Sequence, residues 1–376
     1  MTDHRLFFQL LKNELWRSGE VPERLSEKEF EQVYTVAREQ TVLGLVCNAI
    51  IRNDVLTGDD NAMRVMAVKV NHERRAGKME KALHALISCL HEHHMNYVVF
   101  KGQTLAALYP TPIMRTLGDI DFYYESTDEE RVRQAIEKTM GVQIHLSDLD
   151  KHHAFEYDGI RFEMHYRLET FGSSRHQHYF DDLVKQSIKH IEEVQINGVN
   201  VRILPPMMNI ILCFKHLFNH FLVEGVGLRQ LCDMAMLLHR YHGKIDANEL
   251  EHHLSKIGYL KAFKAVGALM VKYLGLPAEE FPLELTERDC GWADKILNEV
   301  MKRADIGMMV LANVPAFYYG TSPNKFFDYI ASGLPVVNNY PGWLADMINE
   351  NKCGIAVEPE KPELFADAMI KLAEHP

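Results

Sequence analysis

The residues of this chain best suited to chemistry are two aspartates two positions apart, Asp119 and Asp121. They lie in the run from Leu117 to Tyr124, which has the composition of a β-strand. Side chains at positions i and i+2 of a strand share a face, so both carboxylates point the same way while Ile120 and Phe122 point into a core. Two such carboxylates can hold Mg²⁺, a hard cation that favours oxygen ligands and often works with substrate phosphates. Taken alone, the pair also fits the ordinary alternative of solvated strand carboxylates.

A third carboxylate is available on a later predicted strand. Glu163 shares the polar face of that strand with Arg161, His165 and Arg167, while the alternate residues are apolar and should pack inward. Glu163 completes a three-carboxylate site if the two strands are neighbours. The alternatives are an ion pair of Glu163 with Arg161 or Arg167 and a purely structural role for His165.

Two basic groups are placed to meet a phosphate. Lys101-Gly102-Gln103 forms a predicted turn from a strand into a helix, which offers backbone N–H groups and the charge of the lysine. Arg115, four residues before Asp119, could reach the same phosphate. For Lys101 the alternative is a solvated surface lysine.

The elements that must position these residues begin with a helical N-terminal part. The spacing of apolar residues predicts a long helix from about Asn61 to His94. Ser26 followed by Glu29 is a candidate capping box for a helix that runs through Ala37. Tyr97 to Phe100 then predicts a buried strand that ends at the lysine turn, Thr104 to Tyr109 a helix stopped by prolines, and Asp128 to Thr139 another helix.

Two hairpins should follow the aspartate strand. Asp158-Gly159 and Asn197-Gly198 each separate two strand-like runs, and both dipeptides favour a type I′ turn. A mixed sheet of about four to six strands is therefore expected. Further helices are predicted from Pro205 to about Val300, at Met207 to Leu222, Leu228 to Tyr241, Ala247 to Ile257 and Ala262 to Leu274.

The pattern changes again from about Arg303. Short apolar runs at Ile306 to Leu311, Pro335 to Val337 and Gly354 to Val357 read as strands. Predicted helices lie between and after them, at Asn324 to Ser332, Leu344 to Asn349 and Pro362 to Glu374. Alternating strands and helices at this spacing predict parallel βαβ units.

Composition limits the class of protein. The 376 residues allow two or three domains, and the net charge of −11 argues against a general nucleic-acid binder. The six cysteines are far apart and form no C-x-x-C, which indicates reduced thiols in a cytoplasmic protein. The most apolar stretch, Met207 to Val223, contains Lys215 and two histidines, so it suits a buried helix better than a membrane span. The 20 histidines include no pair with the spacing and partners of a zinc motif, and solvated or core histidines are the default.

The order of these motifs resembles the bacterial DNA-polymerase-β-like nucleotidyltransferases. Their pattern of a K-G turn, R-x-x-x-D-I-D and a later E-x-H is matched by Lys101-Gly102, Arg115 to Asp121, and Glu163 to His165. His216 and the segment Gly227 to Asp233 resemble the H…R-x-x-x-D part of the family, so the resemblance covers about residues 1–300. In the wider superfamily a Gly-Gly or Gly-Ser pair stands where this chain has Lys101-Gly102.

The resemblance implies a mechanism. Asp119 and Asp121 would hold Mg²⁺ on the triphosphate of an NTP, and Glu163 would bind a second Mg²⁺ or help to deprotonate the acceptor. Lys101, Gly102, Gln103 and Arg115 would bind the phosphates. The acceptor stays open, and a catalytically silent nucleotide-binding module is the alternative function.

The C-terminal part resembles a different family. Ala304 to Gly307 and Ser322 to Val337 are similar to the A-D-h-G and S-P-N-K-h-h-E-Y-h-A-x-G-x-P-V-V motifs of group 1 GT-B glycosyltransferases. Asp328 stands where that family has a glutamate that contacts the donor ribose, and Gly320 stands where it has the other glutamate of its pair. Because only the second half of a donor domain is matched, a partial unit is expected, which could form a homo-oligomer through its open edges.

Together these patterns predict an α+β protein in four parts. They are an N-terminal helical segment (1–95), a nucleotidyltransferase core with a mixed sheet (96–205), a helical domain (206–302) and a partial Rossmann-like unit (303–376). The expected function is Mg²⁺-dependent nucleotidyl transfer from an NTP to an unknown acceptor, without a membrane span. A glycosyltransferase-related role in polysaccharide synthesis is a further alternative.

Overall fold

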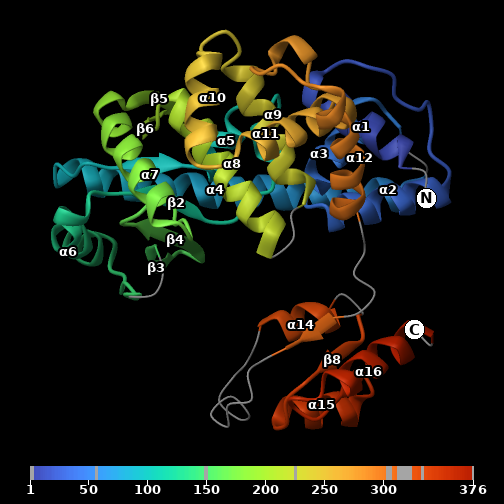
Figure 1. The fold of residues 1–376 in the computed structure, drawn as a ribbon. Coiled ribbons are helices and arrows are strands. Elements are labelled where there is room, and N and C mark those ends of the chain that lie inside the picture. Colours follow the sequence, from blue (N-terminus) through green and yellow to red (C-terminus); the bar gives the residue numbers. More distant parts are fainter. Residues whose placement is uncertain are drawn as a thin grey trace. The chain divides into compact units, whose positions relative to one another are not determined.

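A computed structural model of the chain describes residues 4–55, 58–147, 151–223, 227–301, 307–310, 324–331 and 334–374. The chain divides into two compact units, Met1–Val300 and Met301–Pro376 (Figure 1).

The first unit begins with helices, as the apolar spacing predicted. They are α1 (Arg5–Trp16), α2 (Glu27–Glu39), α3 (Leu43–Arg52) and the long α4 (Asp59–Glu92). The predicted capping box is confirmed: the Ser26 side chain accepts a hydrogen bond from the Glu29 backbone N–H, and the Glu29 carboxylate accepts one from the Ser26 backbone N–H.

A mixed four-stranded sheet follows, in the order β1-β2-β4-β3. Its strands are β1 (Val98–Phe100), β2 (Ile120–Tyr123), β3 (His152–Tyr157) and β4 (Ile160–His165). Strand β2 runs parallel to β4 and antiparallel to β1, and β3 is antiparallel to β4. Asp158 and Gly159 both have positive φ, as a type I′ turn requires, so the first predicted hairpin is confirmed.

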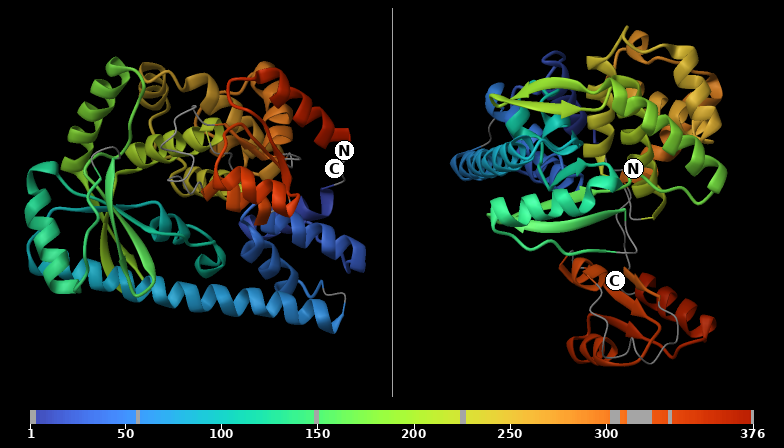
Figure 2. Two further views of the ribbon diagram at one scale, coloured as in Figure 1. Left: turned by 90° about the horizontal axis from the view of Figure 1, so that it is seen from below. Right: turned by 90° about the vertical axis from the view of Figure 1, so that its left-hand side faces the viewer.

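The two faces of this sheet differ in chemistry. One face packs its apolar residues, among them Ile120, Phe122 and Phe162, against buried residues of α4 such as Leu83 and Leu86. Figure 2 shows α4 along one side of the sheet. The opposite face presents the residues that alternate with these, including Asp121 and Glu163. Period-2 alternation therefore separates the core from the polar face, as predicted.

Strand β2 is shorter than its sequence suggested. It begins at Ile120 rather than Leu117, because β1 ends at Phe100 and the chain then turns away at Lys101, which leaves the residues before Ile120 without a partner on that side. Asp119 thus lies one residue ahead of the strand. The helix predicted for Thr104 to Tyr109 is the short α5 (Gly102–Ala106).

The second hairpin is confirmed but forms a sheet of its own, β5 (Glu192–Ile196) with β6 (Val199–Ile203). Other elements connect the strands of the core. They are η1 (Pro112–Met114), η2 (Ser126–Asp128), α6 (Glu129–Met140), α7 (Ser174–Ser187) and η3 (Ile188–His190).

Helices complete the first unit, as predicted. They are α8 (Pro206–Val223), α9 (Leu228–Arg240), α10 (Ala247–Lys256), α11 (Leu260–Leu269), the π-turn η4 (Met270–Leu274), η5 (Ala278–Glu280) and α12 (Glu287–Met301). Searching the described helices for one long and apolar enough to cross a membrane yields no candidate.

The second unit contains the predicted parallel sheet, in the order β7-β8-β9. Its elements are β7 (Gly307–Met309), α14 (Asn324–Ala331), β8 (Val336–Asn338), α15 (Trp343–Asn351), β9 (Gly354–Ala356) and α16 (Pro362–Glu374). A small core gathers Phe326, Val336, Leu344 and Ile348. Gly320 and the side chain of Asp328 lie outside the described residues.

Candidate active site

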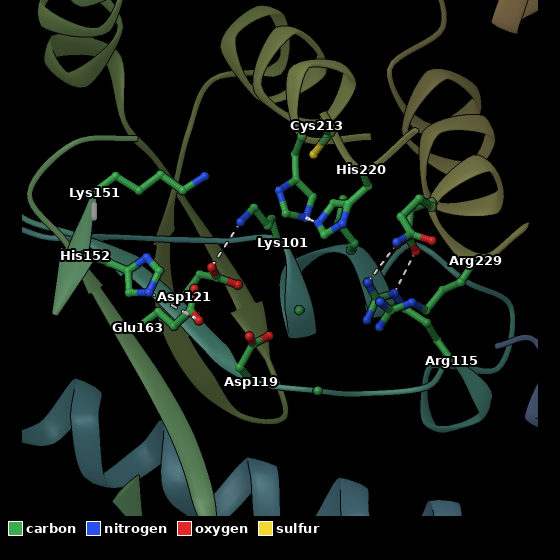
Figure 3. A pocket seen from close by; sticks show the side chains of 16 residues that line it. Lys101, Arg115, Asp119, Asp121, Lys151, His152, Glu163, Cys213, His220 and Arg229 are labelled. Atoms are coloured by element: carbon green, nitrogen blue, oxygen red, sulfur yellow. Dashed lines mark hydrogen bonds and ion pairs between the residues drawn. The ribbon is translucent and has the colours of Figure 1, made fainter. Parts of the chain in front are cut away.

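The strand register brings the predicted carboxylates together. Asp121 of β2 stands directly opposite Glu163 of the parallel strand β4, and both belong to the polar face of the sheet. Asp119, at the entrance to β2, lines the same cavity as these two residues (Figure 3). The condition for a three-carboxylate site, that the two strands be neighbours, is therefore met.

Lys101 lies beside these carboxylates rather than at the surface. Its Nζ donates a hydrogen bond to Oδ1 of Asp121 at 3.1 Å, and the lysine is buried. Its backbone has a φ of 56°, a strained value for a residue with a Cβ. The next residue, Gly102, has a φ of 33°, and a Cβ there would lie 3.1 Å from the carbonyl oxygen of Asp119. The tight turn therefore needs glycine at 102 and points the lysine at Asp121.

Asp121 is the ionised centre of the cluster. Burial alone would raise its pKa, but Lys101 and the ring of His165 outweigh this effect and hold the pKa below the ordinary value. Nε2 of His165 lies 3.1 Å from Oδ1 of Asp121, the same oxygen that accepts from Lys101. Neither contact involves Oδ2.

The pKa of Asp119 is shifted in the opposite direction. Burial, followed by repulsion from Asp121 and Glu163, raises its pKa above the ordinary value. Among the described residues no cation forms an ion pair with Asp119. Negative charge on Asp119 is therefore unfavourable until a cation arrives.

The three carboxylates open into a cavity of about 380 Å³. Residues from α8 and α9 form the wall that lies apart from the sheet. They are Cys213, His216, His220, Arg229, Gln230 and Asp233. The sequence motifs H…R-x-x-x-D thus meet the D-x-D motif across one cavity.

Arg115 has a different partner from the one its sequence position suggested. Its Nε and Nη2 donate to the two carboxylate oxygens of Asp233 at 2.6 and 2.7 Å, and both side chains are buried. Tyr109 donates a further hydrogen bond to Asp233. This bidentate pair ties Arg115 to α9, and Arg115 also lines the cavity, so its contact with a phosphate stays a prediction.

The Gln103 side chain does not reach the cavity. Its Nε2 faces the carbonyl of Met79 on α4 at 3.5 Å, so it points away from the carboxylates. Arg229, which the sequence showed only as part of a family motif, does line the cavity, together with Lys101, Arg115 and Lys151. Burial, and then repulsion from Arg115, lowers the pKa of Arg229, and its Nε has no hydrogen-bond partner among the described residues.

A buried charge cluster behind the cavity was missed in the sequence. The Glu169 carboxylate is fully buried and lies 2.6 Å from Nζ of Lys151 and 3.6 Å from Nδ1 of His216. Burial would raise the pKa of Glu169, but His216 and Lys151 outweigh it and hold the pKa well below the ordinary value. The sequence did contain a hint of this cluster. Glu169 continues the series of alternate residues that starts at Glu163 on the polar face of the strand.

We expect His216 to stay neutral at physiological pH. Burial, and then the charge of Lys101, lowers its pKa to about 4. Two-dimensional NMR of the histidine rings should show no titration of His216 between pH 6 and 8, while in urea it should titrate near the ordinary value of about 6.5. The unfolded chain then binds the extra proton between pH 6.5 and 4, so His216 should lower the free energy of unfolding as the pH falls through that window. Titration of the folded ring near 6.5 would contradict this expectation.

The fold and the site define the class of the protein as nucleotidyltransferase-like, with an α+β core and carboxylates on adjacent strands. The chain belongs to the family described as uncharacterised nucleotidyltransferase, whose model matches residues 26–275. The family makes the protein a transferase. A second model, described as glycosyl transferases group 1, matches residues 279–375. The second match begins before α12, although the structure packs α12 in the first compact unit.

Solved structures with detectable similarity are distant. The solution structure of the antibiotic-resistance factor ANT(2'')-Ia is 13% identical, with a TM-score of 0.36 over 50% of this chain and 94% of that one. Its crystal structure with adenylyl-2"-tobramycin is 12% identical, with a TM-score of 0.35 over 48% and 97%. An antigenic nucleotidyltransferase-like protein from Paracoccidioides brasiliensis is 11% identical, with a TM-score of 0.30 over 51% and 90%. No curated protein matches this chain.

Proposed function

We propose that this protein transfers a nucleotidyl group from an NTP to an acceptor with the help of divalent metal ions. The observation that supports this most is the shared cavity of Asp119, Asp121 and Glu163, with Lys101 on one side and Arg229 on the other. Three carboxylates and two cations suit a metal-bound triphosphate, whose charge needs both kinds of partner.

The donor set fits Mg²⁺. Asp119 has a raised pKa and forms no ion pair among the described residues, and Asp121 keeps Oδ2 outside its contacts with Lys101 and His165. Asp119 and Asp121 would hold the ion that accompanies the triphosphate, and Glu163 would hold a second ion. When bound, such ions neutralise phosphate charge and stabilise the attacking and leaving oxygens of an in-line displacement.

The other residues would bind and orient the nucleotide. Gly102 lets the phosphates approach the backbone of the turn, and Lys101 supplies a positive charge beside Asp121. Arg229 would donate to the phosphates with its guanidinium, whose Nε has no hydrogen-bond partner among the described residues, the role that the sequence had suggested for Arg115. Arg115 would act through Asp233, by fixing the helix that presents Arg229.

The direct test is nucleotide binding followed by transfer. Calorimetry with each of the four Mg-NTPs should give saturable binding to the full chain, and label at the α-phosphorus should pass to a small-molecule acceptor pool. Binding without transfer to any acceptor would favour the silent nucleotide-binding module. Absence of binding for every NTP would overturn the proposal.

Substitution of Arg229 should weaken nucleotide binding without harming the fold. Arg229→Gln removes a charge-assisted contact to phosphate, which corresponds to a rise of about tenfold in the Kd or KM for the NTP. Because the pKa of Arg229 is lowered in the fold, the free energy of unfolding should stay equal or rise slightly. Arg202→Gln, at the arginine that pairs with Glu193 on the second hairpin, is the matched control. Equal nucleotide affinity for Arg229→Gln and wild type would contradict this role.

The remaining features of the proposal concern the setting of the enzyme. The six cysteines are free thiols, which favours the reducing cytoplasm.

In the second unit Val310 and Ile370 are 59% and 56% exposed, which supports self-association through this partial unit. Light scattering of the full chain should then report a homo-oligomer, and Ile370→Glu should shift it toward the monomer.

A further inference from the structure

Two imidazole rings flank the third carboxylate of the site. His152 of β3 is paired with His165 of β4, and both lie on the polar face that holds Glu163. Nε2 of His152 lies 3.5 Å from one oxygen of Glu163, and Nε2 of His165 lies 3.5 Å from the other. The ring centroids of the two histidines are 4.8 Å apart. The carboxylate thus lies between two ring nitrogens that face it.

The two nitrogen–oxygen separations of 3.5 Å are close to those of ligands that share one ion. Two ligand atoms about 2.0–2.1 Å from a tetrahedral ion lie about 3.3–3.4 Å apart. One ligand atom each from His152, Glu163 and His165 lie within 4.8 Å of one another. Oδ1 of Asp121 is 3.1 Å from Nε2 of His165, so a fourth ligand atom lies close to the group.

The orientation of His165 supports the same conclusion. The ring is fully buried, and its Nδ1 lies 3.4 Å from the carbonyl oxygen of Arg167. With the proton on Nδ1, the ring donates to the carbonyl of Arg167 and the lone pair of Nε2 faces the carboxylates; with the proton on Nε2, the ring donates to Asp121 at 3.1 Å. Only the first tautomer can bind a cation through Nε2, and a cation between this nitrogen and the oxygens of Asp121 and Glu163 would select it.

The ligand types select the ion. Mg²⁺ prefers oxygen ligands and usually keeps several waters, whereas imidazole nitrogen suits Mn²⁺, Co²⁺ and Zn²⁺ increasingly well. Asp119 and Asp121 offer oxygen alone, while the neighbouring group offers two nitrogens and one or two oxygens. The two ends of the carboxylate cluster therefore differ in the metal they favour.

We infer that His152, Glu163 and His165 form a transition-metal site, distinct from the Mg²⁺ position at Asp119 and Asp121. A catalytic role for the ion bound there rests on the proposed function. Binding of a metal at this site does not. Histidine spacing along the chain gave no zinc motif, because the ligands lie on two different strands and meet only through their pairing. When no metal is bound, nearby cations partly neutralise these carboxylates. Lys101 pairs with Asp121, and the exposed Arg161 pairs with Glu163.

Cobalt provides a readout that needs neither nucleotide nor turnover. Co²⁺ added to the full chain should bind with a stoichiometry of one at low concentration and develop visible absorption of a nitrogen-ligated ion. His152→Gln should lower Co²⁺ and Mn²⁺ affinity at least tenfold and remove this absorption. His153→Gln is the matched control, since His153 is the next residue of β3 and lies on the other face of the strand, paired with Met164.

The outcomes separate this inference from the proposed function. His165 is fully buried, so His152→Gln is the primary variant and circular dichroism verifies its fold. An unchanged Co²⁺ spectrum in His152→Gln, or a spectrum lost in Asp119→Asn but kept in His152→Gln, would place the ion at the aspartates and overturn the inference. Nucleotidyl transfer with Mg²⁺ alone and no Co²⁺ signal would leave the proposed function standing and reject this site.

Discussion

Asp119→Asn should abolish nucleotidyl transfer and leave the protein at least as stable as the wild type. A metal ion contributes several kcal/mol to charge stabilisation in phosphoryl transfer, so its loss corresponds to a fall of about 10³-fold or more in kcat/KM. The raised pKa of Asp119 means that its charge opposes folding at neutral pH. The Asp119 carboxyl group binds its proton more tightly in the folded protein than in the unfolded chain. The free energy of unfolding therefore falls as the pH rises through the pKa of the folded state. The neutral amide removes this penalty.

Asp121→Asn is the comparison that makes the test specific. It should abolish transfer to the same extent, but it should also destabilise the fold by about 3–5 kcal/mol, because it leaves the buried Lys101 without its carboxylate. Urea unfolding measures the stability difference, and transfer of α-labelled nucleotide measures the activity. Measurable transfer by Asp119→Asn at the wild-type rate would refute the assignment. Equal destabilisation by both substitutions would show that Asp119 also has a structural role.

Disruption of the Arg115–Asp233 pair should produce a large loss of stability. Arg115→Met leaves the Asp233 carboxylate buried without a counter-ion, which costs about 3–5 kcal/mol. The Asp233 carboxylate raises the pKa of Arg115 in spite of burial, as expected for a tight bidentate pair. The free energy of unfolding from urea titration, with coincident circular dichroism and fluorescence transitions, is the measurement.

Two controls distinguish the ion pair from its surroundings. Tyr109→Phe removes only the hydroxyl hydrogen bond to Asp233 and should cost about 1 kcal/mol. The double variant Arg115→Met, Asp233→Leu removes both charges, so its cost should be well below the sum of the single costs. Strict additivity of the two single variants would show that the pair is not coupled. If Arg115→Met instead weakened nucleotide binding with no loss of stability, the result would favour the phosphate role predicted from the sequence.

Local chemistry made several elements of this fold predictable. Asp158-Gly159 and Asn197-Gly198 identify hairpins, because both residues of each turn have positive φ and few dipeptides tolerate this. Ser26 and Glu29 identify a helix start, because a capping box needs only residues three positions apart. The apolar and polar faces of β2 and β4 follow from a period of two. Each of these patterns is set within a few residues of the chain.

The partners of the site residues required the tertiary structure. Asp121 stands opposite Glu163 only because β2 and β4 are parallel neighbours in one particular register. Arg115 finds Asp233, 118 residues away, and His152 finds His165 across a strand pair. Sequence by itself determined that Asp119 and Asp121 share a side of the chain and could hold a cation. Which charges meet them was decided by packing and register, since one guanidinium can satisfy either a phosphate or a buried carboxylate and only the fold fixes which is within reach.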